Sequence, residues 1–151
     1  MFTDGACSNN GRADPVAGIG VHWPDFPERD IAEPVRGDKH TNNVAELQAV
    51  GRALEDIQAL LAAEVHSAAD TFVIWSDSTY TLKALTEWWS LWKLKGFPAK
   101  IQNLELITAV QGRLEALGPR VQLRYVRGHG DSKGNQRADF LARQGALKVK
   151  T

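Results

Sequence analysis

The sequence has almost none of the features that mark secreted or membrane proteins. Among its 151 residues Cys7 is the only cysteine, so an intrachain disulfide cannot form. No run of about 18 apolar residues is present, and the first residues do not form the basic and apolar regions of a secretory signal. We therefore expect a protein of the cytoplasm or another reducing intracellular compartment, not a secreted one, with no membrane contact.

The chain also lacks net charge, because 18 Lys and Arg residues balance 18 Asp and Glu residues. The two signs are nevertheless separated along the sequence. Residues 1–82 hold 5 basic and 13 acidic side chains, whereas residues 83–151 hold 13 basic and 5 acidic ones. This division suggests an acidic site beside a basic surface, although chance clustering of surface charge would produce it equally well.

Repeats, low-complexity tracts and linkers are absent, so we interpret the whole chain, residues 1–151, as a single domain. Its first part predicts strands at 2–8 and 17–23 and a weaker one at 29–37. Since only three residues precede Asp4, we expect the first strand to be short and frayed at its start. An apolar stripe with helical spacing comes next, formed by Leu47, Val50, Leu54, Ile57 and Leu61.

The second part of the chain alternates between strand and helix patterns. The continuous apolar run 71–75 is typical of a strand buried on both faces. Helices are predicted over 78–96, 104–117 and about 135–146, and residues 121–126 alternate as a strand. Three strands followed by β-α-β crossovers predict an α/β fold with a mixed five-stranded sheet, antiparallel and then parallel, flanked by helices.

Four carboxylates stand where predicted strands end or helices begin: Asp4, Glu46, Asp77 and Asp139. Each has an ordinary structural explanation. Asp4 precedes a glycine, as in a turn, and Glu46 stands three residues after Asn43, as in a helix cap. Asp77 or Ser78 would cap the following helix, and Asp139 would favour a helix N-terminus electrostatically.

Taken together, the four acids indicate a metal site. Carboxylates that converge on one edge of a sheet repel one another unless cations lie between them. Since the sequence offers no cluster of Cys and His, a hard ion with oxygen ligands is the natural occupant, either Mg²⁺ or Mn²⁺. Two such ions about 3.5–4 Å apart are a common device for phosphoryl transfer.

Four longer segments each carry several informative residues: FTDGACSNNG, TNNVAELQAVGRAL, SDSTYTLKALTEWWSLWK and VRGHGDSKGNQRADFLAR. In this order, and over about residues 2–146, they resemble the type 1 ribonuclease H family. The resemblance implies an RNase H-like fold and endonucleolytic hydrolysis of the RNA strand of RNA–DNA hybrids, leaving 3′-hydroxyl and 5′-phosphate ends. We expect a monomer without a separate hybrid-binding domain.

The resemblance also implies catalytic roles. Two divalent ions, Mg²⁺ or alternatively Mn²⁺, would be held by four carboxylates: Asp4, Glu46, Asp77 and Asp139. One ion would activate the attacking water, and the other would stabilise the leaving 3′ oxygen. His129, between two glycines in the loop before the last helix, would assist proton transfer and product release, although an exposed loop histidine is the simpler interpretation.

Substrate contacts are implied as well. The 2′-hydroxyls of the RNA strand would be read by side chains and backbone of Cys7, Asn9, Asn10, Asn42 and Asn43. The DNA strand would contact Lys39, Thr41, Tyr80, Trp88, Trp92 and Asn103. Lys93 and Lys95 match a basic protrusion that holds phosphates. An aromatic face at helical spacing, such as that of Trp88 and Trp92, is otherwise a sign of core packing.

Two other interpretations of the sequence stay open. The first is a non-catalytic domain that binds hybrids within a larger assembly, but such a domain gains nothing from four mutually repelling carboxylates. The second is a ribonuclease H domain released from a reverse transcriptase polyprotein, which would share the chemistry and differ in biological role.

Overall fold

A computed structural model of the protein describes residues 1–63, 71–128 and 130–148. Its elements keep the predicted order. They are β1 Phe2–Ser8, β2 Val16–His22, β3 Ile31–Pro34, α1 Asn42–Ala62, β4 Phe72–Ser76, α2 Thr79–Lys83, a π-helical turn Ala84–Trp88, α3 Trp89–Leu94, α4 Leu104–Leu117, β5 Val121–Tyr125 and α5 Lys133–Leu147, with short 3-10 turns at Pro27–Arg29 and Gly118–Arg120. None of the described helices is long and apolar enough to cross a membrane.

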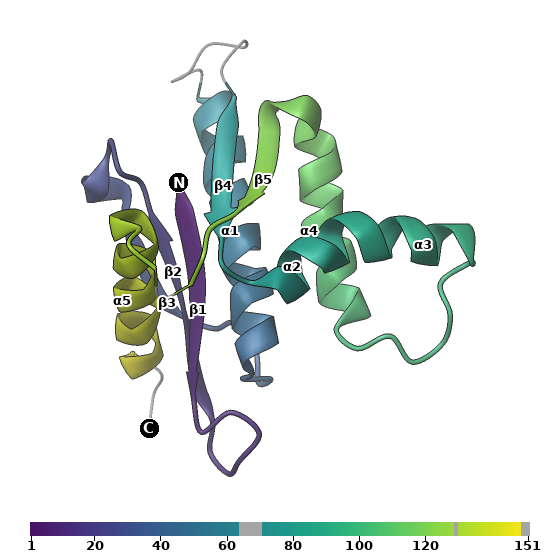
Figure 1. Cartoon of the computed structure of the whole chain (residues 1–151), viewed down its shortest axis with the longest axis horizontal. Helices are drawn as coiled ribbons and strands as arrows, with labels where there is room; N and C mark the ends of the chain where they lie inside the picture. Colours follow the sequence, from purple (N-terminus) through teal and green to yellow (C-terminus); the bar gives the residue numbers. More distant parts are fainter. Residues whose placement is uncertain (64–70, 129, 149–151) are drawn as a thin grey trace.

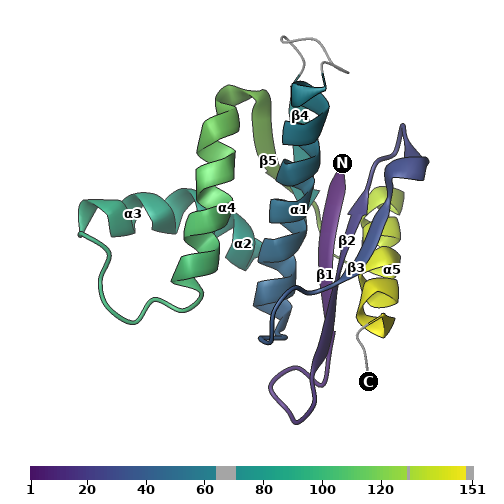
Figure 2. The same ribbon diagram turned by 180° about the vertical axis from the view of Figure 1, so that it is seen from behind.

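The strands form one sheet in the order β3-β2-β1-β4-β5. The pairs β1–β2 and β2–β3 are antiparallel, whereas β1–β4 and β4–β5 are parallel. The predicted mixed five-stranded sheet is therefore confirmed. Helices α1 and α4 lie on one face of the sheet and α5 lies on the other, while α2 and α3 extend to the side as an arm (Figures 1 and 2).

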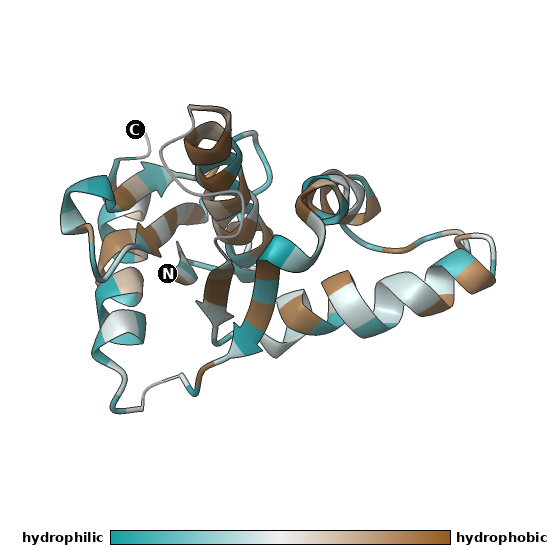
Figure 3. Ribbon diagram, turned by 90° about the horizontal axis from the view of Figure 1, so that it is seen from above, coloured by the Kyte–Doolittle hydropathy of each residue, from teal (hydrophilic) through white to brown (hydrophobic). Residues whose placement is uncertain are grey.

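The predicted apolar stripe of α1 forms the centre of the main core. Leu47, Val50, Leu54 and Ile57 are fully buried, and they pack with Ile74 of β4. Figure 3 shows α1 as the most continuously apolar helix, next to the sheet. Since each fully buried aliphatic side chain contributes about 1.5–3 kcal/mol, this stripe is enough to hold α1 against the sheet.

Strand β4 is buried on one face only, so the prediction of burial on both faces is wrong. Phe72, Ile74 and Ser76 point into the core, but Val73 and Trp75 are partly exposed. The physical reason is the placement of α5, which packs chiefly on β1, β2 and β3 and leaves the opposite face of β4 largely uncovered.

Helix α5 lies unusually close to β2. A Cβ atom placed on Gly18 would lie 2.0 Å from the backbone nitrogen of Ala146, a distance that no side chain tolerates. Glycine at this position therefore lets the helix backbone rest on the strand backbone. This close contact brings Asp139 of α5 over the sheet, beside the central strand.

The expected frayed start of β1 is wrong. The Met1 amine donates to the Val73 carbonyl (2.9 Å), and the Trp75 N–H donates to the Met1 carbonyl (2.9 Å). The Phe2 ring stacks on Trp75 with 6.2 Å between ring centroids. Because Met1 is hydrogen-bonded to β4 and the pairing of β1 with β2 begins at Phe2, the strand is held by its neighbours from its first residue.

Candidate active site

The site lies where β1 and β4 separate. These strands pair only at Phe2 with Trp75 and at Thr3 with Ser76, after which their paths diverge. Asp4 comes after the last paired residue of β1, and Asp77 comes after that of β4. Ligands of open α/β sheets commonly bind at such a fork, because the carboxyl ends of the strands leave a crevice there.

Three of the predicted carboxylates meet in this crevice: Asp4 from β1, Glu46 from the first turns of α1 and Asp77 directly after β4. One oxygen of each lies within 4.8 Å of one oxygen of the other two. The backbone N–H of Gly5 donates to Asp4 Oδ1 (3.0 Å) and to Glu46 Oε1 (2.8 Å). This shared donor fixes two of the carboxylates relative to each other.

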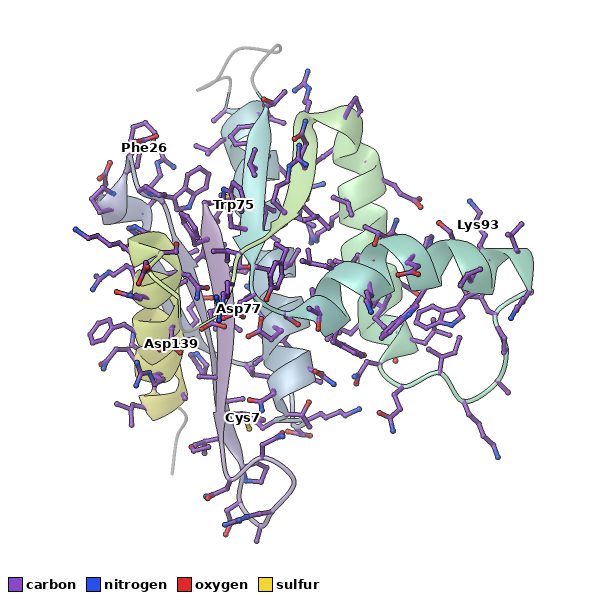
Figure 4. All side chains as sticks on the ribbon, viewed as in Figure 1. Cys7, Phe26, Trp75, Asp77, Lys93 and Asp139 are labelled. Atoms are coloured by element: carbon purple, nitrogen blue, oxygen red, sulfur yellow. The ribbon has the colours of Figure 1, made fainter. Side chains whose placement is uncertain are left out.

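Asp139, the fourth predicted acid, lies on the opposite wall. It lines the same cavity of about 240 Å³ as the other three acids. Figure 4 shows Asp139 on α5 and Asp77 near the end of β4, so the two side chains come from different walls of the site. The carboxylate of Asp139 accepts a hydrogen bond from Arg143 Nη2 (2.6 Å), one helical turn away. Asp139 therefore faces the site without belonging to the tight group of three.

Burial dominates the electrostatics of this site. It raises the pKa of Asp4 far above the ordinary value, with further contributions from the Glu46 carboxyl group and from the charges of Asp77 and Asp139. Burial also raises the pKa of Glu46 to about 7, although hydrogen bonds from Asp4 and Gly5 oppose the increase. Without a cation, the fully ionised cluster is therefore unfavourable.

The donor set fits a hard divalent cation. In the ionised site, Oε2 of Glu46 is buried and has no hydrogen-bond donor among the described residues. The ligand atoms offered are carboxylate oxygens, which suit Mg²⁺ and Mn²⁺, and the described part of the chain places no histidine or cysteine in the group. A bound cation would both satisfy the free oxygen and offset the repulsion.

Asn135 is a site residue that the sequence analysis missed. It lies in the first turn of α5, is almost fully buried and lines the acidic cavity. Its Nδ2 donates to Asp77 Oδ2 at 3.4 Å, while its Oδ1 has no partner among the described residues. The available signal was its spacing, since a residue four positions before Asp139 shares the same helix face.

His129 lies outside the described residues. Its neighbour Gly128 lies next to the acids, since a Cβ atom on Gly128 would come within 3.0 Å of Asp77 Oδ2. The chain on the N-terminal side of His129 therefore passes beside the carboxylates.

The residues predicted to read RNA lie on two adjacent segments, the β1–β2 hairpin and the start of α1. The Asn42 N–H donates to Asn10 Oδ1 (3.1 Å), which joins the two segments. The predicted capping role of Asn43 is wrong, because Thr41 caps α1 through a hydrogen bond from the Val44 N–H to Thr41 Oγ1 (3.1 Å). Asn43 is consequently an exposed residue of the first turn.

The residues predicted to hold DNA, except Thr41, form one chain of contacts. Lys39 Nζ donates to Asn103 Oδ1 (2.6 Å), and Asn103 Nδ2 donates to Tyr80 Oη (3.1 Å). The ring of Tyr80 meets Trp88 edge-on at 5.6 Å between centroids, and Trp88 lies 6.2 Å from Trp92. Both tryptophans pack against the core yet stay partly exposed, so packing and surface contact are compatible here.

The predicted basic protrusion lies on the arm. Lys93 and Lys95, at the end of α3, are exposed, and Figure 4 shows Lys93 pointing away from the body of the molecule. Leu94 between them is 85% exposed. The arm thus offers positive charge beside the aromatic row formed by Tyr80, Trp88 and Trp92.

Comparisons with known proteins agree with this arrangement. The family model described as RNase H matches residues 1–147. A ribonuclease H of Schizosaccharomyces pombe is 38% identical over 150 residues, which cover 97% of this chain and 52% of that protein. A ribonuclease H of Aromatoleum aromaticum is 37% identical over 158 residues, which cover 99% of this chain and 91% of that protein.

Solved structures share the fold. The foamy viral protease-reverse transcriptase in complex with RNA/DNA hybrid superposes with a TM-score of 0.74 at 21% identity, over 98% of this chain and 20% of that one. The chain spans about half the length of the eukaryotic relatives that it matches, such as the fission yeast protein.

Proposed function

The chain belongs to the RNase H family, and on this premise we propose that it hydrolyses the RNA strand of RNA–DNA hybrids. The observation that carries the proposal is the convergence of Asp4, Glu46 and Asp77, from three separate elements, within 4.8 Å. A foamy viral relative of the same fold was solved with a bound RNA/DNA hybrid, which supports the choice of substrate.

We propose that two divalent ions are held by Asp4, Glu46, Asp77 and Asp139. Ions held there would supply an activated water and would neutralise charge at the scissile phosphate, and the expected products carry 3′-hydroxyl and 5′-phosphate ends. The Gly5 N–H orients Asp4 and Glu46, and Asn135 orients Asp77. Arg143 bonds only Oδ2 of Asp139, so the other carboxylate oxygen of Asp139 would be free to bind an ion.

The proposed roles of the surrounding residues depend on their places. His129, the residue after Gly128 in the sequence, would move a proton and assist product release. Cys7, Asn9, Asn10, Asn42 and Asn43 would contact the RNA strand from the hairpin and the start of α1. Across α1, the DNA strand would contact Lys39, Thr41, Tyr80, Trp88, Trp92 and Asn103, with Lys93 and Lys95 holding phosphates.

The decisive test is cleavage of a labelled RNA–DNA hybrid in Mg²⁺, beside double-stranded DNA and double-stranded RNA. We expect cleavage of the RNA strand of the hybrid only, and only with the metal present. Equal cleavage of the three duplexes, or cleavage in excess chelator, would contradict the proposal. Mapping the ends of the fragments tests the expected 3′-hydroxyl and 5′-phosphate chemistry.

Trp88→Ala is expected to weaken hybrid binding about five- to tenfold, because it removes the aromatic surface between Tyr80 and Trp92. The maximal rate at saturating hybrid should change little, since the carboxylates stay in place. Leu94→Ala, on the same arm and 85% exposed, is the matched control and should bind as wild type. Unchanged binding together with a large loss of thermal stability would identify Trp88 as a core residue only.

A further inference from the structure

His40 makes two hydrogen bonds that determine its protonation state. The Ala17 N–H donates to His40 Nδ1 (2.9 Å), so Nδ1 carries no proton. His40 Nε2 lies 3.1 Å from the Gly37 carbonyl oxygen, which can only accept, so Nε2 carries the proton. The geometry therefore requires a neutral imidazole in the Nε2–H tautomer.

The imidazole ties together two segments that the β-sheet does not join. The Ala17 carbonyl accepts a hydrogen bond from the Val35 N–H, one residue beyond the last pair of the β2–β3 ladder. Without His40, the Ala17 N–H would have no strand partner at this edge. His40 supplies the missing acceptor from the loop of residues 37–41. The Cys7 thiol also approaches the His40 carbonyl (3.6 Å), so the same loop is held from β1.

The His40 anchor lies next to the residues proposed to contact RNA. His40 stands between Lys39 and Thr41 and shortly before the asparagines that begin α1. The Asn42 N–H bonds to Asn10 of the hairpin, so the anchor and the asparagine contact lie side by side. The hairpin and the start of α1, which this loop precedes, together carry every residue proposed to contact RNA.

We propose that neutral His40 is a positioning residue for hybrid binding, which locks the loop of residues 37–41 onto the β1–β2 hairpin and makes hybrid affinity fall in acid. The inference rests on the proposed function. A protonated imidazole donates from both nitrogens, so Nδ1–H would then oppose the Ala17 N–H. The anchor would be lost, and hybrid binding would have to reorder the two RNA-contacting segments.

The charged groups around the imidazole do not compensate for the loss of the hydrogen bond from the Ala17 N–H. Asp38 and Lys39 precede His40 in the sequence, and the Lys39 ammonium is bonded to Asn103. The Cys7 thiol is the titratable group that faces it from β1, β2 offers only backbone, and the first turn of α1 offers the amides of Asn42 and Asn43. Among the described residues, no carboxylate lies within 4.0 Å of the His40 ring nitrogens to accept a proton from Nδ1.

The test compares hybrid binding by wild type, His40→Ala and His40→Asn in excess chelator, by fluorescence anisotropy of a labelled hybrid. The Asn side chain places an acceptor near the position of Nδ1 and does not titrate. At pH 7.5 we expect Kd to rise about five- to tenfold for His40→Ala and less than about twofold for His40→Asn. Between pH 7.5 and 5.0 the wild-type Kd should rise about tenfold relative to that of His40→Asn.

Taking the ratio to His40→Asn at each pH cancels the titration of the acidic site, which both proteins share. His22→Asn, which removes an imidazole paired with Asp30 (2.9 Å) at the other end of β2, is the matched control and should keep the wild-type pH dependence. Wild-type binding by His40→Ala, or a constant ratio across the pH range, would overturn the inference and leave the proposed function intact.

Imidazole nitrogen NMR of the wild-type protein tests the anchor without substrate. We expect an unprotonated Nδ1 on His40 at pH 7.5 and an Ala17 amide resonance that shifts as the hydrogen bond to Nδ1 is lost in acid. A protonated Nδ1 at pH 7.5 would overturn the inference. Wild-type protein that does not prefer hybrid over double-stranded DNA at any pH would instead overturn the proposed function, and the binding role of His40 with it.

Discussion

Asp77→Asn is expected to lower hybrid cleavage about a thousandfold or more while hybrid binding stays within about threefold of wild type. Asp77 links the groups of the site, because it lies within 4.8 Å of both Asp4 and Glu46 and accepts from Asn135. An amide has the same shape but removes one negative charge from the metal site. Loss of several kcal/mol of transition-state stabilisation corresponds to at least three orders of magnitude in rate.

Single-turnover cleavage and hybrid binding, measured on the same preparation, check this prediction. Asp25→Asn, which changes an exposed carboxylate away from the cavity, is the matched control and should cleave as wild type. An Asp77→Asn protein that is active at the wild-type rate would show that Asp77 is not a metal ligand. Loss of hybrid binding in parallel with activity would instead indicate a misfolded crevice.

Asp4→Asn is expected to stabilise the metal-free protein at pH 7.5 by about 2 kcal/mol, or about 4–8 °C in Tm. The raised pKa values of Asp4 and Glu46 mean that the folded state holds protons that the unfolded chain has already released. Stability therefore falls as pH rises from about 4, the ordinary carboxyl range, through 7, where Glu46 ionises. The Asn side chain can still accept from the Gly5 N–H and can donate to Glu46, so it removes a charge without leaving a gap.

Thermal unfolding at pH 4.0 and pH 7.5, with and without Mg²⁺, checks this second prediction. The gain from Asp4→Asn should be large at pH 7.5 and small at pH 4.0, which is close to the ordinary carboxyl pKa, so that the unfolded chain has released only part of its protons. Mg²⁺ should raise the Tm of wild type more than that of the variant. An ion that binds the folded state stabilises it, and the variant has one carboxylate fewer to hold the ion. A variant that is less stable at pH 7.5, or a gain that does not depend on pH, would contradict the electrostatic account.

Much of the fold could be predicted because its signals are local. The helical spacing of Leu47, Val50, Leu54 and Ile57 determines which face of α1 is buried, and the structure buries that face. The order of strands and helices was predicted in the same way. Two wrong predictions concern features that depend on residues far away in the sequence. One face of β4 stays uncovered because α5 packs elsewhere, and the start of β1 is paired because β4, residues 72–76, lies beside it.

The candidate site shows the same division. Residue type and order predicted the four carboxylates and their preference for a hard cation, since that chemistry belongs to the side chains themselves. The sequence analysis missed the pairing of Asp139 with Arg143, the contact of Asn135 with Asp77 and the capping of α1 by Thr41 rather than Asn43. The first two could have been suspected, because Asn135, Asp139 and Arg143 are spaced four residues apart on one helix face.

The sequence by itself therefore determined the identity of the reactive groups and the periodicity of the elements that carry them. The tertiary structure alone decided which groups meet, because this depends on the separation of β1 from β4 after two residue pairs and on the backbone contact of α5 with β2. The neutral tautomer of His40 is decided in the same way. A proton's position on an imidazole is set by the Ala17 N–H and the Gly37 carbonyl that face it, one of them 23 residues away along the chain.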